Sequence, residues 1–322
     1  MSNVSHSPIA DSAVAIPPCP ITGEPAVALA QTVRCEFLAR LWEIEFKVNA
    51  RPSFGGASHL SLWRSPTGLL FFSPALVGDA DFYKTFYKTL GPKLFPREDR
   101  PRAEFLAAAR HIEDGARVLD VGCGFGGFRP FVRHANYLGL DPHFAGEEVD
   151  WARSESLAEH LTENRGAYDA VCAFQVIEHV AKPAQLFAEM AAAAKPGGRV
   201  IIGVPHVPSA MARIPNFLLN APPHHLTWWS KQALQALAQR EGLIVETIQQ
   251  VAWSKLDSLV YWIERCSVVR CKDVYFKHAW TWHFSALSGL ALGYLMDKFL
   301  GPPKRIVDEG SGLLLVARKP PV

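Results

Sequence analysis

The stretch Val118-Leu-Asp-Val-Gly-Cys-Gly-Phe-Gly-Gly127 decides the fold of this chain. A short apolar run ends in the acid Asp120 and then opens into closely spaced glycines, which is the pattern of a buried strand, a tight turn and a helix N-terminus. Gly122 and Gly124 let the backbone turn sharply and approach a ligand, because they carry no Cβ atom. Amides at the start of the following helix can then face the polar atoms of a nucleotide-like cofactor.

The glycines alone do not identify that cofactor. Gly122, Gly124 and Gly127 also satisfy the G-x-G-x-x-G pattern of dinucleotide-binding proteins. Asp141 ends the next predicted strand, about 20 positions after the first of these glycines, which is the usual spacing of a ribose-binding acid. The residues therefore predict a ribose-containing ligand and leave its identity open.

Three further segments narrow the choice. Asp120 stands two residues before the glycines, where a carboxylate can hold a cationic amino group that a nicotinamide dinucleotide lacks. Residues 168–180 read as a strand that runs into a helix, and residues 195–205 read as a helix end, a turn and a strand. In this order and spacing the segments resemble the class I S-adenosylmethionine-dependent methyltransferases. The resemblance covers residues 102–251 and a last strand at 312–319, and it implies S-adenosylmethionine as the cofactor.

The alternation of elements predicts a doubly wound, Rossmann-like α/β sheet of seven strands, with helices on both faces. Strands are expected up to Asp120 and Asp141 and at 149–151, 167–174, 199–204, 243–251 and 312–319. Helices are expected at 101–110, 127–134, 155–163, 183–194 and 231–240. A ligand of such a sheet belongs at the carboxyl ends of its strands.

We divide the chain into a flexible N-terminus (1–18), a small irregular region (19–87) and a methyltransferase domain (88–322). The phrases Cys19-Pro-Ile-Thr-Gly23 and Arg64-Ser-Pro-Thr-Gly68 resemble the two knuckles of the zinc ribbon that some class I methyltransferases carry at this end. Thr22, Arg64 and Thr67 stand where the other thiolates would be. One thiol cannot make a tetrahedral zinc site, so we interpret the region as a degenerate ribbon without metal.

A helical insertion at 252–311 separates the last strand from the rest of the domain. It is rich in aromatic residues, and no formally charged residue occurs between His278 and Asp297. Such a run is close to the lower limit for spanning a bilayer, but spanning would put the last strand on the wrong side of the membrane. We expect a buried cap over the substrate site. A peripheral membrane contact through 279–300 is the second interpretation.

The composition is that of an ordinary globular protein, with 49% hydrophobic residues and a formal net charge of +2. This charge argues against a nucleic-acid binder driven by bulk electrostatics. The six cysteines form no paired framework, which favours a reducing compartment. The N-terminus shows no basic start followed by an apolar core, so we expect no signal peptide and a cytoplasmic location, with an optional contact to the inner face of a membrane.

The resemblance implies a set of cofactor-binding residues at the strand ends. Asp141 would accept hydrogen bonds from both ribose hydroxyls, and Asp120 would lie near the methionine amino group. Ser154 departs from the family at a position where an acid often contacts the adenine amine. The complete expected set is Asp120, Gly122, Gly124, Asp141, Ser154, Glu155, Phe174 and Gln175.

The segment Gln175-Val-Ile-Glu-His179 raises the question of a metal. It resembles part of an E-x-x-E-H element that binds magnesium in small-RNA 2′-O-methyltransferases and in ubiquinone-pathway O-methyltransferases. Gln175 replaces the first carboxylate, which removes a charged ligand from a site for a hard cation. We expect no metal here.

The most distinctive element on the substrate side is Asn220-Ala-Pro-Pro-His-His-Leu-Thr-Trp-Trp229. Two prolines stiffen the approach to His224 and His225, so both imidazoles should occupy defined positions. Methyl transfer from a sulfonium needs a nucleophile that has lost its proton, and a histidine with a near-neutral pKa suits that task. We therefore take His224 and His225 as the candidate catalytic residues.

These observations predict an S-adenosylmethionine-dependent methyltransferase that methylates an oxygen atom of a small molecule, a sugar or a lipid-linked acceptor. One alternative is a protein of the same fold that binds the cofactor without turnover and serves as a partner or sensor. A nicotinamide-dependent oxidoreductase is disfavoured by the Glu-His and Pro-Gly-Gly segments. The sequence leaves the acceptor and the oligomeric state open.

Overall fold

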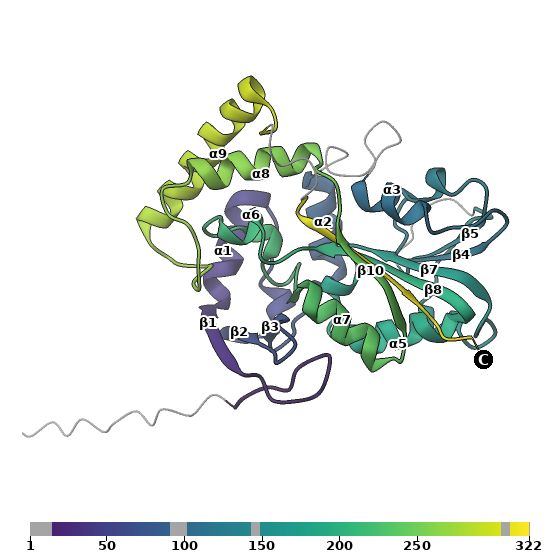
Figure 1. Ribbon diagram of the computed structural model, residues 1–322. Helices are drawn as coiled ribbons and strands as arrows, with labels where there is room; N and C mark the ends of the chain where they lie inside the picture. The colour runs from purple at the N-terminus through teal and green to yellow at the C-terminus, as the bar shows by residue number, and fades with distance from the viewer. Residues whose placement is uncertain (1–14, 91–101, 143–148, 304–309, 322) are drawn as a thin grey trace, which may run out of the picture.

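A large mixed β-sheet and a small antiparallel sheet organise the computed structural model, which describes residues 15–90, 102–142, 149–303 and 310–321 (Figure 1). The large sheet has seven strands in the order β10-β11-β8-β7-β4-β5-β6. Their bounds are β4 Arg117–Val121, β5 Asn136–Leu140, β6 Ala152–Arg153, β7 Tyr168–Phe174, β8 Ala194–Pro205, β10 Ile244–Gln250 and β11 Gly312–Arg318.

The strand directions confirm the predicted doubly wound sheet. β4 runs parallel to β5 and β7, and β7 runs parallel to β8. β11 is antiparallel to both of its neighbours, β8 and β10. The parallel strands are buried on both faces, which explains why they read as continuous apolar runs in the sequence. Their carboxyl ends bring the residues after β4, β5 and β7 to one edge of the sheet.

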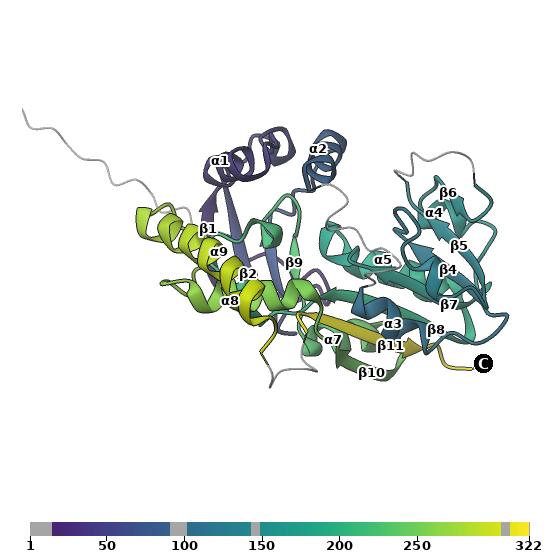
Figure 2. The same ribbon diagram turned by 90° about the horizontal axis from the view of Figure 1, so that it is seen from above.

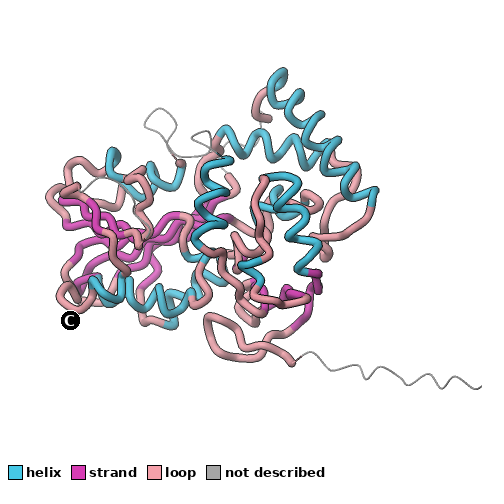
Figure 3. The backbone as a smooth tube through the Cα atoms, turned by 180° about the vertical axis from the view of Figure 1, so that it is seen from behind, coloured by secondary structure: helices cyan, strands magenta, loops and turns pink. Residues whose placement is uncertain are grey.

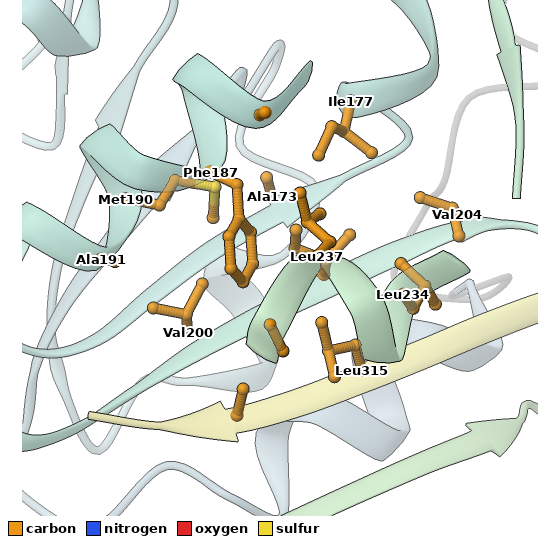
Figure 4. Close-up of a cluster of buried hydrophobic side chains, with 14 of the residues drawn as sticks. Ala173, Ile177, Phe187, Met190, Ala191, Val200, Val204, Leu234, Leu237 and Leu315 are labelled. Carbon is orange, nitrogen blue, oxygen red and sulfur yellow. The ribbon is translucent and has the colours of Figure 1, made fainter. Parts of the chain in front are cut away.

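Helices cover both faces of the large sheet, as Figure 3 shows from behind. On one face lies α3 (Ala103–Ala109), and on the other lie α5 (Pro183–Ala193) and α7 (Lys231–Arg240). Figure 4 shows the second face, where Phe187 and Met190 of α5 and Leu234 of α7 meet Val200 of β8 and Leu315 of β11. The short helix α4 (Leu157–His160) begins with a capping box formed by Ser156 and Glu159.

Two predicted helices are almost absent. In place of a helix at 127–134 the chain forms only a 3₁₀ turn, Arg129–Phe131, and after β7 it forms only Ile177–His179. Gly126, Gly127 and Pro130 explain why no helix forms at 127–134, because ordering glycine in a helix costs backbone entropy and proline lacks an amide donor. A cleft of about 760 Å³ opens beside this turn and is lined by Arg129 and Trp151 among others.

The N-terminal region is more regular than expected. Strands β1 (Ala28–Arg34), β2 (His59–Arg64) and β3 (Leu70–Ser73) form the small sheet together with β9 (Thr227–Trp228) from the other end of the chain. Helices α1 (Cys35–Phe46) and α2 (Ala80–Leu90) pack on it around the fully buried Trp42. The Trp42 indole donates a hydrogen bond to the Pro222 carbonyl at 2.9 Å, which ties this layer to the histidine segment.

The presumed zinc knuckles are joined by hydroxyl groups. The Cys19 thiol lies 2.9 Å from the Ser65 hydroxyl, which lies 2.8 Å from the hydroxyl of Thr67. The backbone amides of Ile21 and Thr22 also donate to the Cys19 sulfur. Ser65 rather than Arg64 therefore faces the remaining thiol. The predicted boundary between residues 87 and 88 falls inside α2, and residues 1–14 of the predicted N-terminal segment lie outside the described residues.

The insertion forms two helices, α8 (Lys255–Cys266) and α9 (Trp280–Leu300). It starts at the carboxyl edge of the sheet, where Asp257 accepts a hydrogen bond from the backbone amide of Ser311 at 2.7 Å. α8 packs against α6 (Ala210–Arg213), and α9 packs along α8, beside α1 and away from the large sheet (Figures 1 and 2). α9 is not the expected buried cap, since Trp280 is 78% exposed. No helix in the described ranges has the length and apolar character needed to cross a membrane.

Candidate active site

The glycine turn after β4 leaves open space on one side. Gly122 and Gly124 have φ values of 69° and 52°, in the left-handed region that favours glycine. A Cβ atom on Gly122 would lie 2.6 Å from the Val176 side chain, whereas one on Gly124 would meet nothing within 4 Å. The amide of Gly124 donates to Oδ2 of Asp141 at 3.0 Å. The turn and the acid at the end of β5 therefore face each other, as the sequence predicts.

Asp120 is a buried acid directly before this turn. Its side chain is 3% exposed, and Oδ2 accepts a hydrogen bond from the Tyr137 hydroxyl at 2.7 Å. Burial raises the pKa of Asp120 to about 7, against the opposing effect of the Tyr137 hydrogen bond. A cationic ligand group beside this carboxylate would restore its ionised form. The arrangement suits a positively charged ligand.

Ser154 and Glu155 follow β6, and both side chains have partners within the fold. The Ser154 hydroxyl donates to the Pro142 carbonyl at 3.4 Å. Oε1 of Glu155 lies 2.7 Å from Nδ1 of His160, whose other ring nitrogen contacts the Tyr168 hydroxyl. Glu155 is thus held in a partly buried polar chain, and the adenine contact expected at these two positions stays a prediction.

Phe174 and Gln175 end β7 in different environments. The Phe174 ring packs between Phe105 and Phe128, with centroid distances of 5.0 and 4.7 Å, so its visible role is packing. Gln175 has a φ of 57°, which is uncommon for a residue with a side chain. Its amide nitrogen donates to Glu104 of α3 at 3.1 Å. Gln175 is therefore held by α3 at the sheet edge that carries the glycine turn.

Three histidines meet at the same edge of the sheet. His179 follows β7, and His224 and His225 precede β9; the centroid distances are 4.5 Å from His179 to His224 and 4.4 Å between the adjacent pair. Nδ1 of His179 lies 2.6 Å from the His224 carbonyl, and Nδ1 of His224 lies 2.9 Å from the Leu219 carbonyl. Because a carbonyl only accepts, both Nδ1 atoms carry the proton and both Nε2 atoms are acceptors.

Burial keeps all three imidazoles neutral. Desolvation holds the pKa of His224 and of His225 well below the usual value and lowers that of His179 to about 4. The expectation of a near-neutral histidine pKa is therefore wrong for this structure, since the sequence shows the residue type but not its burial. Each imidazole can accept a hydrogen bond, but by itself each is a weak proton acceptor.

Glu178 is a buried acid next to His179. Its side chain is 0% exposed, and neither carboxylate oxygen has a hydrogen-bond partner among the described residues. Burial raises the pKa of Glu178 to about 8, and Oε1 lies 3.9 Å from Nε2 of His179. The sequence analysis considered this acid only as a metal ligand. The signal for a base was present, because the acid directly precedes a histidine at the end of a buried strand.

Aromatic side chains from the N-terminal region pack against the histidines. The Phe86 ring of α2 lies 4.7 Å from the His224 ring, and the Tyr83 ring lies 6.3 Å from that of His179. The Tyr83 hydroxyl contacts the Pro223 carbonyl at 3.5 Å. These residues were missed in the sequence because 19–87 was interpreted only as a degenerate zinc ribbon. The repeated aromatic residues of 82–87 were the available signal that this region packs against the site.

The three histidines also have the spacing of a metal site. One ligand atom from each of His179, His224 and His225 lies within 4.8 Å of the others, and this is the one such group that the described ranges contain. Imidazole ligands suit zinc and other transition metals better than magnesium. The sequence analysis expected no metal, and that expectation stays a prediction.

Comparisons with known proteins agree with this geometry. Residues 94–248 match a family model described as a methyltransferase domain. The chain contains an S-adenosylmethionine-dependent methyltransferase domain. It is 28% identical over 169 residues to a ubiquinone biosynthesis O-methyltransferase of Xanthomonas axonopodis pv. citri, covering 46% of this chain and 70% of that protein. A protein of the same name from Dechloromonas aromatica is 36% identical over 104 residues, covering 27% of this chain and 44% of the relative.

The match to such relatives is partial, since the chain spans only 41 to 44% of the length of several of them. A solved S-adenosylmethionine-dependent methyltransferase from Mesorhizobium loti aligns with a TM-score of 0.41 at 18% identity, covering 68% of this chain and 98% of that one. The small sheet and α9 lie outside residues 94–248 of the methyltransferase domain, except for β9.

The residues at the glycine turn fit S-adenosylmethionine. Gly124 leaves its Cβ side open, and Asp141 stands at the end of β5 where a ribose hydroxyl can reach it. Asp120 is a costly buried acid that a cationic amino or sulfonium group would stabilise. The fit concerns the turn and the two acids.

Proposed function

We propose that this methyltransferase domain transfers a methyl group from S-adenosylmethionine to a hydroxyl oxygen of a small-molecule acceptor. The family match and the paired acids at the glycine turn support the cofactor. The relatives named ubiquinone biosynthesis O-methyltransferase support oxygen as the acceptor atom and a phenol-like acceptor.

One observation carries the proposal, namely the unpartnered Glu178 carboxylate beside three neutral imidazoles. The bound cofactor supplies the electrophilic methyl group. The acceptor hydroxyl donates a hydrogen bond to Nε2 of His179, and its proton passes to the ionised form of Glu178, whose Oε1 lies 3.9 Å from that nitrogen. The raised pKa of about 8 makes this carboxylate a stronger base than the imidazoles once it is ionised. Asp120 and Asp141 hold the cofactor, so most of the catalytic effect comes from positioning two reactants in a desolvated site.

Glu178→Gln tests the role of the base. The variant keeps the size of the side chain and removes its proton affinity, so kcat for catechol or another phenol should fall by about 10²- to 10⁴-fold. The dissociation constant of S-adenosylhomocysteine, measured by calorimetry, should stay the same. Glu163→Gln is the matched control, because Glu163 is exposed after α4.

Two results would count against the proposal. Full activity in Glu178→Gln would remove this acid from the reaction. Tight cofactor binding by the wild-type protein without transfer to phenols, sugars or lipid-linked acceptors would favour the alternative of a cofactor-binding protein without turnover.

The histidine spacing favours a second candidate, in which a divalent transition-metal ion is held by His179, His224 and His225 and orients the acceptor oxygen. Elemental analysis and dialysis against a chelator separate the two. In the metal-free mechanism the protein contains no stoichiometric metal and chelation leaves the rate unchanged. One bound ion per chain, lost together with activity in His225→Ala, would establish the second candidate.

A further inference from the structure

The outer surface of α9 is apolar to an unusual degree. Ten large apolar side chains of this helix are more than 40% exposed, and they include Trp280, Phe284, Leu287, Tyr294 and Phe299. Soluble monomers seldom expose a contiguous apolar patch of this kind without a function for it. These side chains were expected to be buried, but they are exposed on α9, which lies on the outside of the molecule next to α8 (Figure 2).

The geometry of the α8–α9 contact explains why this surface stays free. The buried residues of α9 are Ser285, Gly289 and Gly293, which recur every four residues and form one narrow stripe. A Cβ atom on Gly293 would lie 2.6 Å from the backbone nitrogen of Ile263, so the two helices approach closely. Small residues on one side leave every large side chain of α9 pointing elsewhere.

The outward apolar residues follow helical spacing. Trp280, Phe284, Leu287, Ala291 and Tyr294 recur at intervals of three and four residues, opposite the stripe that faces α8. Further exposed side chains, such as those of Leu290 and Phe299, flank this row on both sides. A partner helix would cover one narrow seam, whereas a helix that lies in a lipid interface buries its whole apolar face. The width of the patch therefore favours lipid.

The charges around the patch are complementary to an anionic surface. Exposed basic residues of the described insertion are Lys255, Arg265, Arg270, Lys272, Lys277 and Lys298. Three of its four acids are engaged within the fold: Asp257 with Ser254 and Ser311, Glu264 with Arg213 and Arg270, and Asp297 with Ser258. Among the four acids of the described insertion, only Asp273 is exposed.

We propose that α9 lies flat on an anionic lipid surface, with its outward apolar face at the boundary between headgroups and acyl chains and the exposed lysines at the lipid phosphates. The helix is about 30 Å long at 1.5 Å per residue, and α8 covers only its inner side. Its outward face can therefore contact lipid along its length when the helix axis is parallel to the bilayer. This surface is separate from the cofactor site and goes beyond the proposed reaction.

Co-sedimentation of the full chain with vesicles of phosphatidylcholine, with and without phosphatidylglycerol, tests the proposal. We expect binding to the anionic vesicles that weakens with salt. Trp280→Ser combined with Leu287→Ser and Tyr294→Ser should abolish it. Lys272→Glu with Lys277→Glu should weaken it by about fivefold or more for each charge removed.

Controls match each change in chemistry. Val27→Ser with Ile44→Ser alters equally exposed apolar side chains outside the patch, and Lys231→Glu reverses a charge on α7; both should bind like the wild type. Unchanged circular dichroism and S-adenosylhomocysteine affinity in every variant exclude misfolding as the cause of lost binding.

Two outcomes would overturn the proposal. One is an absence of binding to anionic vesicles by the full chain. The other is a lipid-free dimer in sedimentation velocity that the triple α9 variant converts to monomer, which would make the patch an interface between two copies. Neither outcome affects the test of Glu178, so this inference and the proposed reaction fail separately.

Discussion

At the scale of single residues, burial rather than residue type sets the chemistry of the site. Asp120 and Glu178 are both carboxylic acids whose pKa lies near neutrality because water is excluded from them. The sequence shows where these acids stand along the chain, but it cannot show how much water reaches them. The same limit explains the histidines, whose positions were predicted and whose pKa values were not.

Asp120→Asn should change the pH dependence of cofactor binding. Cationic S-adenosylmethionine favours the ionised carboxylate, so wild-type affinity should fall as the pH drops below about 7, while the variant should bind weakly at every pH. Calorimetry between pH 6 and pH 8 in buffers of different ionisation enthalpy reports both the affinity and the proton released. An identical pH profile in the variant would exclude Asp120 from contact with the cofactor.

The same substitution should affect stability with a defined sign. The pKa of Asp120 is higher in the folded protein than in the unfolded chain. The contribution of this carboxyl group to the free energy of unfolding is therefore fully present below its unfolded pKa and is lost as the pH rises through about 7. Without ligand, Asp120→Asn should therefore be more stable than the wild type at pH 8, by about 4 kcal/mol, and this gain should vanish near pH 4. Urea unfolding at the two pH values measures the difference.

Asp141→Ala should weaken S-adenosylmethionine binding by about 1.5–3 kcal/mol, through the loss of charge-assisted hydrogen bonds. The Gly124 amide would also lose its partner, so the turn itself should loosen. Calorimetry gives the affinity, and Asp114→Ala, an exposed acid before β4, is the control. Unchanged affinity with an intact fold would remove Asp141 from the site.

At the scale of elements, the strands of the large sheet and the helices α5 and α7 were predictable, whereas the helices of the N-terminal region and the segment after the glycine turn were not. The prediction of 231–240 agrees with α7 residue by residue, because Ser230 caps its start and Gly242 follows its end. The predicted helix at 127–134 fails because the alternation of strand and helix was given more weight than Pro130. Periodicity indicates where a helix belongs in the fold, while local backbone chemistry decides whether it forms.

α2 should contribute to the site through packing. Phe86 is 1% exposed and contacts both Trp42 and His224. Phe86→Ala should lower the free energy of unfolding by about 3–5 kcal/mol and should lower kcat more than cofactor affinity, since His224 loses its support. Leu106→Ala, at a half-exposed position of α3, is the control. Equal losses of kcat and cofactor affinity would indicate general unfolding instead.

At the scale of the whole molecule, the N-terminal region and the methyltransferase domain share a sheet. β9 pairs with β3 through Thr227 and Trp228, immediately after the histidines. The resemblance to known methyltransferases covered the large sheet and therefore predicted it well. It held no information on the small sheet, whose fourth strand comes from residues about 150 positions later in the chain.

This shared sheet should make unfolding of the two parts cooperative. Leu62 of β2 is 1% exposed in the core of the small sheet, and Leu62→Ala should lower the single melting transition of the entire chain rather than split off an early one. Differential scanning calorimetry checks this, with Val27→Ala as the exposed control. Two separated transitions would show that the parts unfold independently.

The two-residue strand β9 has a consequence for how this protein can acquire new acceptors. Substitutions in β2 or β3 reach His224 and His225 through β9, and substitutions in α1 reach them through the Trp42–Pro222 hydrogen bond, in both cases without passing through the glycine turn. Substitutions in residues 28–90 can therefore alter the acceptor side of the site while the cofactor side stays constant. The N-terminal region is in this way the part of the enzyme that can vary without disturbing the cofactor site.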